Sequence, residues 1–235
     1  VLYAPLYSGD SQLPEVALTF DDGPNPFYTP QILAILQQYN VKATFFDVGY
    51  LVLDYPDIVR QEFKAGNIVA NHSWSHPLLP SLSAQAVHDQ LGRTSDAIQA
   101  VTGNRPIFFR PPYGSYNSLV IAQAKSFGLS TIIWNDEAHD WMLPGVGVIV
   151  SRILSLARSG AIILLHDGGG IRAQTVAALP YIITALRNRG YSFVTVEQMV
   201  RHLTGHINAS LKGTIAHEGA INHLIQEEII YDRPH

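Results

Sequence analysis

The stretch Val16–Pro24, VALTFDDGP, decides which fold class the chain can adopt. Its apolar part is rich in β-branched and aromatic residues and stops at a Gly-Pro pair, which predicts a buried strand that ends in a loop. Two adjacent carboxylates, Asp21 and Asp22, therefore stand at a strand end, where α/β folds gather their functional groups. Taken alone, the pair is equally compatible with an ordinary turn, because Asp favours turns.

Strand-like and helix-like segments alternate from this stretch to about residue 201. The alternation predicts parallel strands joined by helices, and about seven such units in one domain favour an α/β barrel over an open sheet. Strands are expected at Val16–Phe20, Ala43–Val48, Asn67–Ala70, Ile107–Arg110, Ser130–Trp134, Ala161–Leu165 and Tyr191–Val194. Helices are expected at Pro30–Tyr39, Pro56–Ala65, Ala84–Val101, Ser118–Phe127, Val146–Ser159 and Thr175–Asn188.

The composition limits the kinds of partner that the protein can have. The 235 residues are 47% hydrophobic and 14% charged, which is typical of one large globular domain. With 15 basic and 19 acidic residues the net charge is −4, so we expect no nucleic-acid partner. The absence of cysteine excludes disulfides and thiol nucleophiles. No segment is long and apolar enough to predict a membrane span.

The two ends of the chain differ from its middle. The start at Val1 has neither Met nor the features of a leader segment, so we expect a processed chain. The composition changes after Leu203, where histidines become frequent but no tight ligand pair is recognisable. Residues 203–235 are therefore expected to form a solvated C-terminal extension, with a short helix near Glu218–Ile230.

A pair of histidines follows the strand predicted at Asn67–Ala70. His72 and His76 are four residues apart, a spacing that places them on one side of a helical turn, close enough to share a metal ion. A carboxylate is a common third ligand, and Asp21 and Asp22 are the natural donors because the carboxyl ends of parallel barrel strands share one face. One carboxylate can bind the metal while its neighbour stays free as a base.

Two further polar clusters follow predicted strands. Arg110 stands at a strand end, where a guanidinium can hold a carboxylate, and the Pro-Pro pair after it leaves the backbone N–H of Tyr113 free to donate to an oxyanion. His166 ends the apolar strand at Ala161–Leu165, and a carboxylate such as Asp140 could raise its pKa so that it acts as an acid. Polar clusters at the ends of so many predicted strands indicate an active site.

Together these segments resemble the polysaccharide deacetylases of the NodB-homology type, carbohydrate esterase family 4. The motifs TFDDGP, H-S-x-x-H, R-P-P-Y, D-W after a Trp-containing strand, and L-x-H-D all occur in the order of that family and span residue 16 to about residue 201. The resemblance implies a distorted (β/α) barrel of about seven parallel strands. It also implies that residues 1–202 form the catalytic domain, and it does not extend to residues 203–235.

The resemblance assigns roles to the residues around the carboxylate pair. Asp21 would be the general base, and Arg110 would orient it. Asp22, His72 and His76 would hold one divalent metal ion, with Zn²⁺ expected first and Co²⁺ or Ni²⁺ as alternatives.

The remaining roles concern the substrate. Asp140 would tune His166 as the general acid, and the Tyr113 N–H would face the oxyanion. Trp141 and Leu164 would line the pocket for the acetyl methyl group. One position departs from the family, because Glu137 stands where an Asp is usual.

The implied activity is metal-assisted removal of acetyl groups from polymers that contain N-acetylglucosamine, such as peptidoglycan, chitin or chitooligosaccharides. The resemblance also implies a secreted or cell-surface protein, which we expect to be a monomer. An O-deacetylase acting on xylan or another acetylated polysaccharide is the nearest alternative. Two others are an iron(II) oxygenase, which uses two histidines and one carboxylate, and a non-catalytic sugar-binding relative.

Overall fold

A computed structural model describes residues 2 and 4–205 of the chain. The chain divides into two units, residues 1–199 and 200–235, and each is described by itself. In the second unit, residues 200–205 are described and are helical. The helix expected at Glu218–Ile230 lies outside the described residues, and the domain boundary expected after residue 202 stays a prediction.

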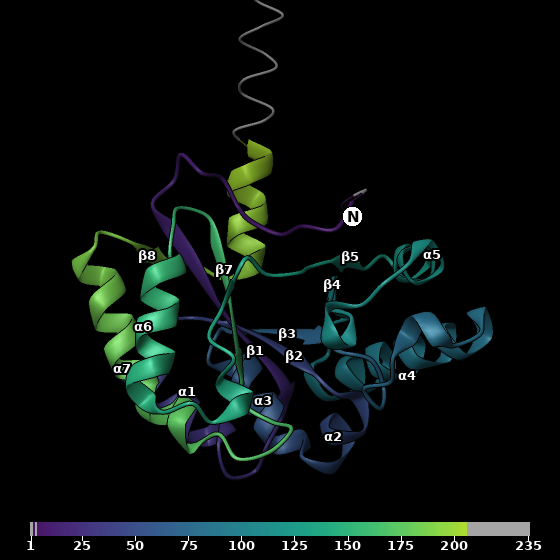
Figure 1. Ribbon diagram of the computed structural model, residues 1–235. Coiled ribbons are helices and arrows are strands. Elements are labelled where there is room, and N and C mark those ends of the chain that lie inside the picture. The colour runs from purple at the N-terminus through teal and green to yellow at the C-terminus, as the bar shows by residue number, and fades with distance from the viewer. Residues whose placement is uncertain (1, 3, 206–235) are drawn as a thin grey trace, which may run out of the picture. The chain divides into compact units, whose positions relative to one another are not determined.

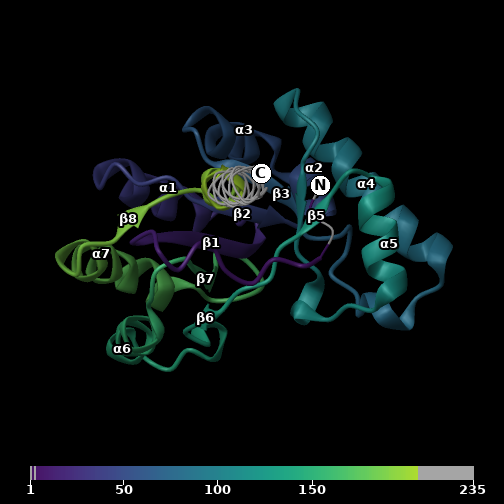
Figure 2. The same ribbon diagram turned by 90° about the horizontal axis from the view of Figure 1, so that it is seen from above.

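In the first unit, a single parallel sheet carries the fold (Figures 1 and 2). The strand order among the described residues is β5-β4-β3-β2-β1-β7-β6, and β8 also pairs with β1. The strands are β1 Glu15–Gly23, β2 Thr44–Asp47, β3 Ile68–Asn71, β4 Phe108–Phe109, β5 Ser130–Thr131, β6 Asp136–Glu137, β7 Ala161–His166 and β8 Ser192–Phe193. The predicted α/β barrel of parallel strands is confirmed, in the distorted form that the resemblance implies.

Helices cover the outside of the curved sheet, as the view from above shows (Figure 2). Their ends follow local sequence signals. Ser83 caps the N-terminus of α4 by accepting from the N–H of Ala86, and Gly103 ends that helix with a left-handed backbone. The helices are α1 Thr29–Gln38, α2 Gly49–Asp54, α3 Pro56–Lys64, α4 Ala84–Thr102, α5 Ser118–Ser126, α6 Val146–Leu156 and α7 Ala173–Asn188.

The main hydrophobic core lies between the outer face of the central strands and the helices on that side. Phe20 of β1 stacks on Phe45 of β2, with ring centroids 5.2 Å apart, and both side chains are fully buried. Ile32 of α1 and Ile182 of α7 belong to the same cluster. Because side chains alternate along a strand, these residues fix which neighbours point into the barrel.

Two parts of the sheet were not predicted. β6 consists of Asp136 and Glu137, which carry no strand signal, and it forms because these residues pair in parallel with Ile163 and Leu164 of β7. The N-terminal segment joins the edge of β5, where the N–H of Leu6 donates to the Thr131 carbonyl at 2.9 Å. Among the described helices, none is both long and apolar enough to cross a bilayer.

The folding stability of the protein depends on pH through Asp136, in this part of the sheet. Its side chain is 1% exposed, and neither carboxylate oxygen accepts a hydrogen bond from the described residues. Burial raises the pKa of Asp136 to about 7, although the charge of Arg158 lowers it. The folded state therefore holds this proton more tightly than the unfolded chain, so the carboxyl group destabilises the fold as the pH rises from about 4 to about 7.

We predict that Asp136→Asn removes this loss of folding stability with rising pH. The stability of the variant relative to the parent should be greater at about pH 8 than at about pH 4, by about 4 kcal/mol. Urea unfolding at the two pH values measures the difference, with the exposed Asp96→Asn as the control. An equal difference at both pH values would contradict the prediction.

Candidate active site

The residues singled out in the sequence lie together at the carboxyl ends of the strands. A pocket of about 870 Å³ opens there and is lined by Asp21, Asp22, His72, His76, Tyr113, Trp141, Leu164 and His166. The other two predicted site residues, Arg110 and Asp140, are fully buried and contact residues that line the pocket.

A β-bulge brings the two adjacent carboxylates to the same pocket. In a regular strand their side chains would point to opposite faces of the sheet. Consecutive residues of β2 lie opposite Asp21 and Gly23, which leaves Asp22 as an extra residue in β1. Asp22 has a left-handed backbone with a φ of 72°. The bulge therefore turns its carboxylate toward the pocket that Asp21 also lines.

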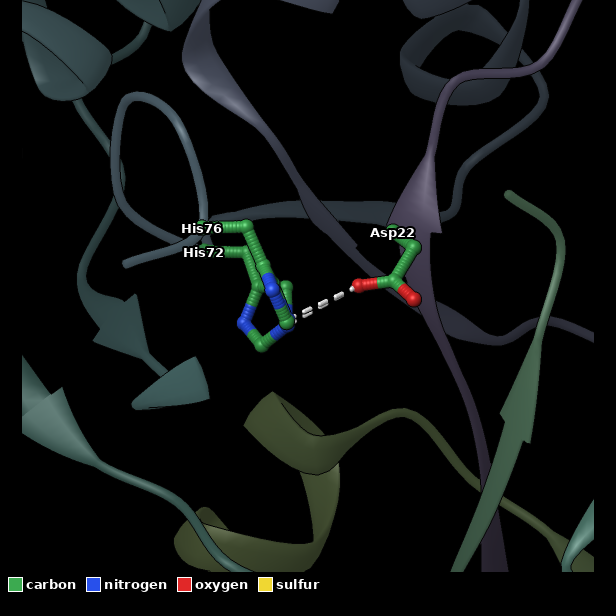
Figure 3. A group of neighbouring side chains, drawn as sticks. All are labelled: Asp22, His72 and His76. Carbon is green, nitrogen blue, oxygen red and sulfur yellow. Dashed lines mark ion pairs between the residues drawn. The ribbon is translucent and has the colours of Figure 1, made fainter. Parts of the chain in front are cut away.

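Asp22, His72 and His76 form a cluster of potential metal ligands (Figure 3). The Nε2 atoms of His72 and His76 lie 3.4 and 3.1 Å from Oδ1 of Asp22. That oxygen is buried and accepts no hydrogen bond from the described residues. One donor atom from each of the three residues lies within 4.8 Å of the others. Two imidazoles and a carboxylate that converge in this way fit a divalent transition-metal ion.

The protonation states of the cluster also suit a metal ion. Burial raises the pKa of Asp22, but interaction with His72 and the charges of His166 and His76 bring it below its usual range. Burial lowers the pKa of His76, and the charge of His72 lowers it further. Burial also lowers the pKa of His72, but Asp21 and Asp22 raise it overall. Metal binding requires the ionised carboxylate and neutral imidazoles, and it would displace the proton that these acids stabilise on His72.

The expectation that the two histidines meet on a helical turn is wrong. Residues 72–78 form a loop, and within it Ser73 and His76 have left-handed backbones with φ of 66° and 58°. These two residues fold the loop back on itself, so that the rings of His72 and His76 lie 5.0 Å apart without a helix. Periodicity could not reveal this, because single left-handed residues other than glycine leave little trace in a sequence.

Side chains from neighbouring elements hold this loop in place. Oδ1 of Asn71 accepts a hydrogen bond from the N–H of Ser73 at 2.8 Å. Oε1 of Gln90, on α4, accepts from the N–H groups of Trp74 and Ser75 at 2.8 and 2.9 Å. The Gln90 amide also donates to Oγ of Ser75 at 3.0 Å. Gln90 therefore replaces the hydrogen bonds that a helix would have supplied, and nothing in its sequence context indicated this role.

Asp21 is fixed by a buried ion pair. Nη1 of Arg110 donates to Oδ1 of Asp21 at 2.7 Å and to Oγ1 of Thr19 at 2.8 Å. The other oxygen of Asp21 lies 3.7 Å from Nε2 of His72, beside the metal-ligand cluster. Arg110 thus orients one oxygen of Asp21 and leaves the other facing the pocket.

His166 stands next to Asp21 across the β1–β7 pairing and has its own carboxylate partner. Nδ1 of His166 lies 2.7 Å from Oδ1 of Asp140, while Oδ2 of Asp140 accepts from the His166 N–H and from the Thr175 hydroxyl. Burial lowers the pKa of His166, but the hydrogen bond and charge of Asp140 raise it overall. The imidazole can therefore hold a proton on Nε2 at the pocket.

The remaining predicted residues form the mouth and wall of the pocket. Tyr113 is 67% exposed, has a left-handed backbone and packs its ring edge-on against His76. Trp141 is half exposed, and Leu164 is buried in the wall. Glu137 also lines the pocket, where it accepts a hydrogen bond from the indole N–H of Trp134 at 3.1 Å. The carboxylate that differs from the family pattern therefore lies at the pocket rim.

Two glycines next to Asp22 were not recognised as part of the site. A Cβ atom on Gly168 would lie 1.8 Å from the carbonyl oxygen of Asp22, and one on Gly169 would lie 2.5 Å from its Oδ2 atom. Only glycine can therefore pack against the bulged residue from the loop that follows β7. The run of three glycines at residues 168–170 was the signal in the sequence that could have indicated this close approach.

Known proteins are similar to this chain in sequence and in fold. Residues 8–132 match the family described as polysaccharide deacetylase. A peptidoglycan-N-acetylglucosamine deacetylase of Bacillus cereus is 41% identical over 80% of this chain and 88% of its own length. A chitooligosaccharide deacetylase of a Bradyrhizobium species is 40% identical over 82% of this chain and 94% of its own length.

A solved structure gives the same result. The crystal structure of a peptidoglycan N-acetylglucosamine deacetylase in complex with 4-naphthalen-1-yl-N-oxidanyl-benzamide has a TM-score of 0.82 at 35% identity, over 84% of this chain and 92% of that one. The chain therefore belongs to the polysaccharide deacetylases, and among them to the NodB-homology type, carbohydrate esterase family 4. The resemblance in the sequence is thereby confirmed.

The support that Gln90 gives to the histidine loop leads to a prediction about metal affinity. Gln90→Leu should weaken the binding of a divalent metal ion by about 10-fold or more, because residues that orient metal ligands typically contribute that much. Calorimetric titration of the metal-free protein measures the change. Gln85→Leu, at an exposed position of the same helix, is the matched control. Equal affinities in the two variants would contradict the role assigned to Gln90.

Proposed function

We propose that this protein is a metal-dependent hydrolase that removes acetyl groups from N-acetylglucosamine residues of a polysaccharide such as peptidoglycan, chitin or a chitooligosaccharide. The observation that carries the proposal is the convergence of three units on one pocket. These are the metal-ligand cluster, the Asp21–Arg110 pair and the His166–Asp140 pair. The activities named for the relatives support the choice of substrate.

The metal centre would consist of Asp22, His72 and His76. We propose Zn²⁺ as the ion, with Co²⁺ or Ni²⁺ as substitutes that the same nitrogen and oxygen donors accept. A divalent ion held there would polarise the acetamide carbonyl and lower the pKa of a water molecule. The parallel α/β sheet argues against the iron(II) oxygenase alternative, although the ligand set is similar.

Asp21 would act as the general base. Its free oxygen faces the pocket next to the ligand cluster, and Arg110 keeps the carboxylate from rotating toward the core. Proton transfer from the attacking water to Asp21 then needs no rearrangement of the protein. General-base catalysis of this kind contributes about 10²–10⁴-fold to the rate.

His166 would act as the general acid, and Asp140 would keep it charged. Hydrolysis of an amide requires protonation of the leaving amine, and an imidazolium with a raised pKa can deliver that proton near neutral pH. Trp141 and Leu164 would contact the sugar ring and the acetyl methyl group. The backbone N–H of Tyr113 would donate to the oxyanion as it forms.

The proposed function includes a location and an assembly state. We propose a secreted or cell-surface protein, because peptidoglycan and chitin are polymers of the cell exterior, and we propose that it is a monomer. Every position that the mechanism requires is filled by a suitable side chain, which favours catalysis over the non-catalytic, sugar-binding alternative.

Acetate release from a panel of substrates tests the proposed function. Chitooligosaccharides and peptidoglycan present N-acetyl groups, whereas acetylated xylan presents O-acetyl groups. We expect release from at least one N-acetylated substrate, loss of that release with a chelator, and recovery when Zn²⁺ is added back. Release that the chelator leaves unchanged would overturn the metal requirement. Release from acetylated xylan alone would replace the proposal by the O-deacetylase.

Substitutions of the two adjacent carboxylates should have different effects. Asp21→Asn should lower kcat by about 10²–10⁴-fold and still bind one metal ion, because the metal ligands are intact. Its melting temperature should also fall, since Arg110 then keeps a buried charge without an anionic partner. Asp22→Ala should lose the metal.

Elemental analysis of the purified variants and acetate-release kinetics separate these outcomes, with Asp96→Asn as a surface control. Near-parental activity in Asp21→Asn would show that another group is the base. Full metal content in Asp22→Ala would remove Asp22 from the ligand set.

A further inference from the structure

Arg172 is a buried cation at the edge of the pocket that the proposed mechanism does not use. It is 4% exposed, precedes α7 directly, and lines the pocket together with Gly169, Gly170 and Ile171. Among the described residues that line this pocket, it is the only lysine or arginine. A cation in this position attracts anionic groups of any substrate that enters the pocket.

The hydrogen bonds of Arg172 leave part of the guanidinium unused. Nε donates to the carbonyl of Gly168 at 2.7 Å, and Nη1 donates to the carbonyl of Ile171 at 2.8 Å. Within the described part of the chain, Nη2 makes no hydrogen bond, and no carboxylate lies within 4 Å of the guanidinium. Arg110, the other guanidinium at this site, instead has Asp21 at 2.7 Å. A buried cation without an anion is unfavourable, so an anionic partner from outside the chain would stabilise Arg172.

The surroundings of Arg172 favour such a partner. A side chain at Gly170 would lie 3.5 Å from Nη2, so the glycine leaves that side of the guanidinium uncovered. The first turn of α7 contains no acidic residue, and no side chain caps its N-terminus. The positive end of the helix dipole therefore adds to the charge of Arg172.

We propose that Arg172 is an anion subsite of the pocket and that the preferred glycan carries a carboxylate close to the acetamide that is hydrolysed. This inference rests on the proposed function and specifies its substrate class. A guanidinium N–H and a carboxylate oxygen form a strong, charge-assisted hydrogen bond, and arginine is well suited to it. The carboxylate can belong to an acid substituent on the acetylated sugar or to a neighbouring uronic acid.

Matched substrates test the subsite directly. N-acetylated oligosaccharides of each type, with the acid substituent or with the uronic acid, are compared with the same compounds after conversion of the carboxylate to a carboxamide. The readout is the ratio of kcat/KM for carboxylate over carboxamide. We expect a ratio of about 10 or more for at least one type in the parent protein, because a hydrogen bond to a charged group typically contributes that much. The type that gives the ratio identifies the position of the carboxylate.

Variants separate recognition of the anion from support of the loop. Arg172→Gln should bring the ratio close to one, and Arg172→Lys should restore part of it. If Arg172 only orders residues 168–171, Arg172→Gln lowers both rates equally and the ratio stays at the parental value, which would overturn the proposal. A parental ratio near one for both substrate types would overturn it as well. Arg60→Gln, which removes an exposed charge on α3, should keep the parental ratio.

A binding measurement keeps this test independent of catalysis. If no compound releases acetate, the proposed function fails, yet the subsite can still be measured by calorimetric titration of the metal-loaded protein with the same matched pairs. Tighter binding of the carboxylate compound that is lost in Arg172→Gln supports the subsite. Equal binding of both compounds in the parent rejects it.

Discussion

The ion pair between Arg110 and Asp21 is the interaction on which the arrangement of the site depends. Arg110 is fully buried inside the barrel, where a charge is tolerated only if it is paired and hydrogen-bonded. Its guanidinium bonds to Asp21 and Thr19 of β1 and to the carbonyls of residues 132 and 133, and it lies 4.1 Å from the ring centre of Phe46. One side chain thus ties three parts of the sheet together and determines the direction of the carboxylate at the pocket.

The site is also built from backbone conformations that cost free energy. Asp22, Ser73, His76 and Tyr113 all have positive φ values, and such residues persist only where the surrounding structure holds them. The structure shows the supports of Asp22 and Ser73. Glycines pack against Asp22, and Gln90 binds the loop that contains Ser73. A bound cation would add to these supports, because it would join Asp22 to the histidines across the pocket.

The sequence predicts this site better than it predicts the local structure that forms it. The apolar runs give β1, β2 and β7. Apart from Leu164, each predicted site residue lies at or after the carboxyl end of a predicted strand, so the parallel barrel alone brings the groups together. The same signals miss β6, because Asp136 and Glu137 become a strand only through pairing with β7. They also suggest a helical turn between His72 and His76, since the spacing is the same whether a helix or left-handed residues produce it. What the sequence could not supply are the contacts between distant elements, such as those of Gln90.

Buried acids lie on both faces of the sheet, and their partners differ. Asp47 points to the helix side of β2, as Phe45 does, and Glu62 is buried on α3. Burial raises the pKa of Asp47 to about 7, although its interactions with Glu62 and His72 lower it. Burial and the charges of Asp47 and Asp167 hold the pKa of Glu62 well above its usual range. These carboxyl groups therefore keep their protons to a higher pH than exposed carboxyl groups do. Inside the barrel, Asp21 pairs with Arg110 and Asp22 lies against His72 and His76, so a cationic or imidazole partner stands beside each carboxylate that faces the pocket. The division that the mechanism needs, with one carboxylate for the metal and one for the proton, follows from the placement of cations around a bulged strand end.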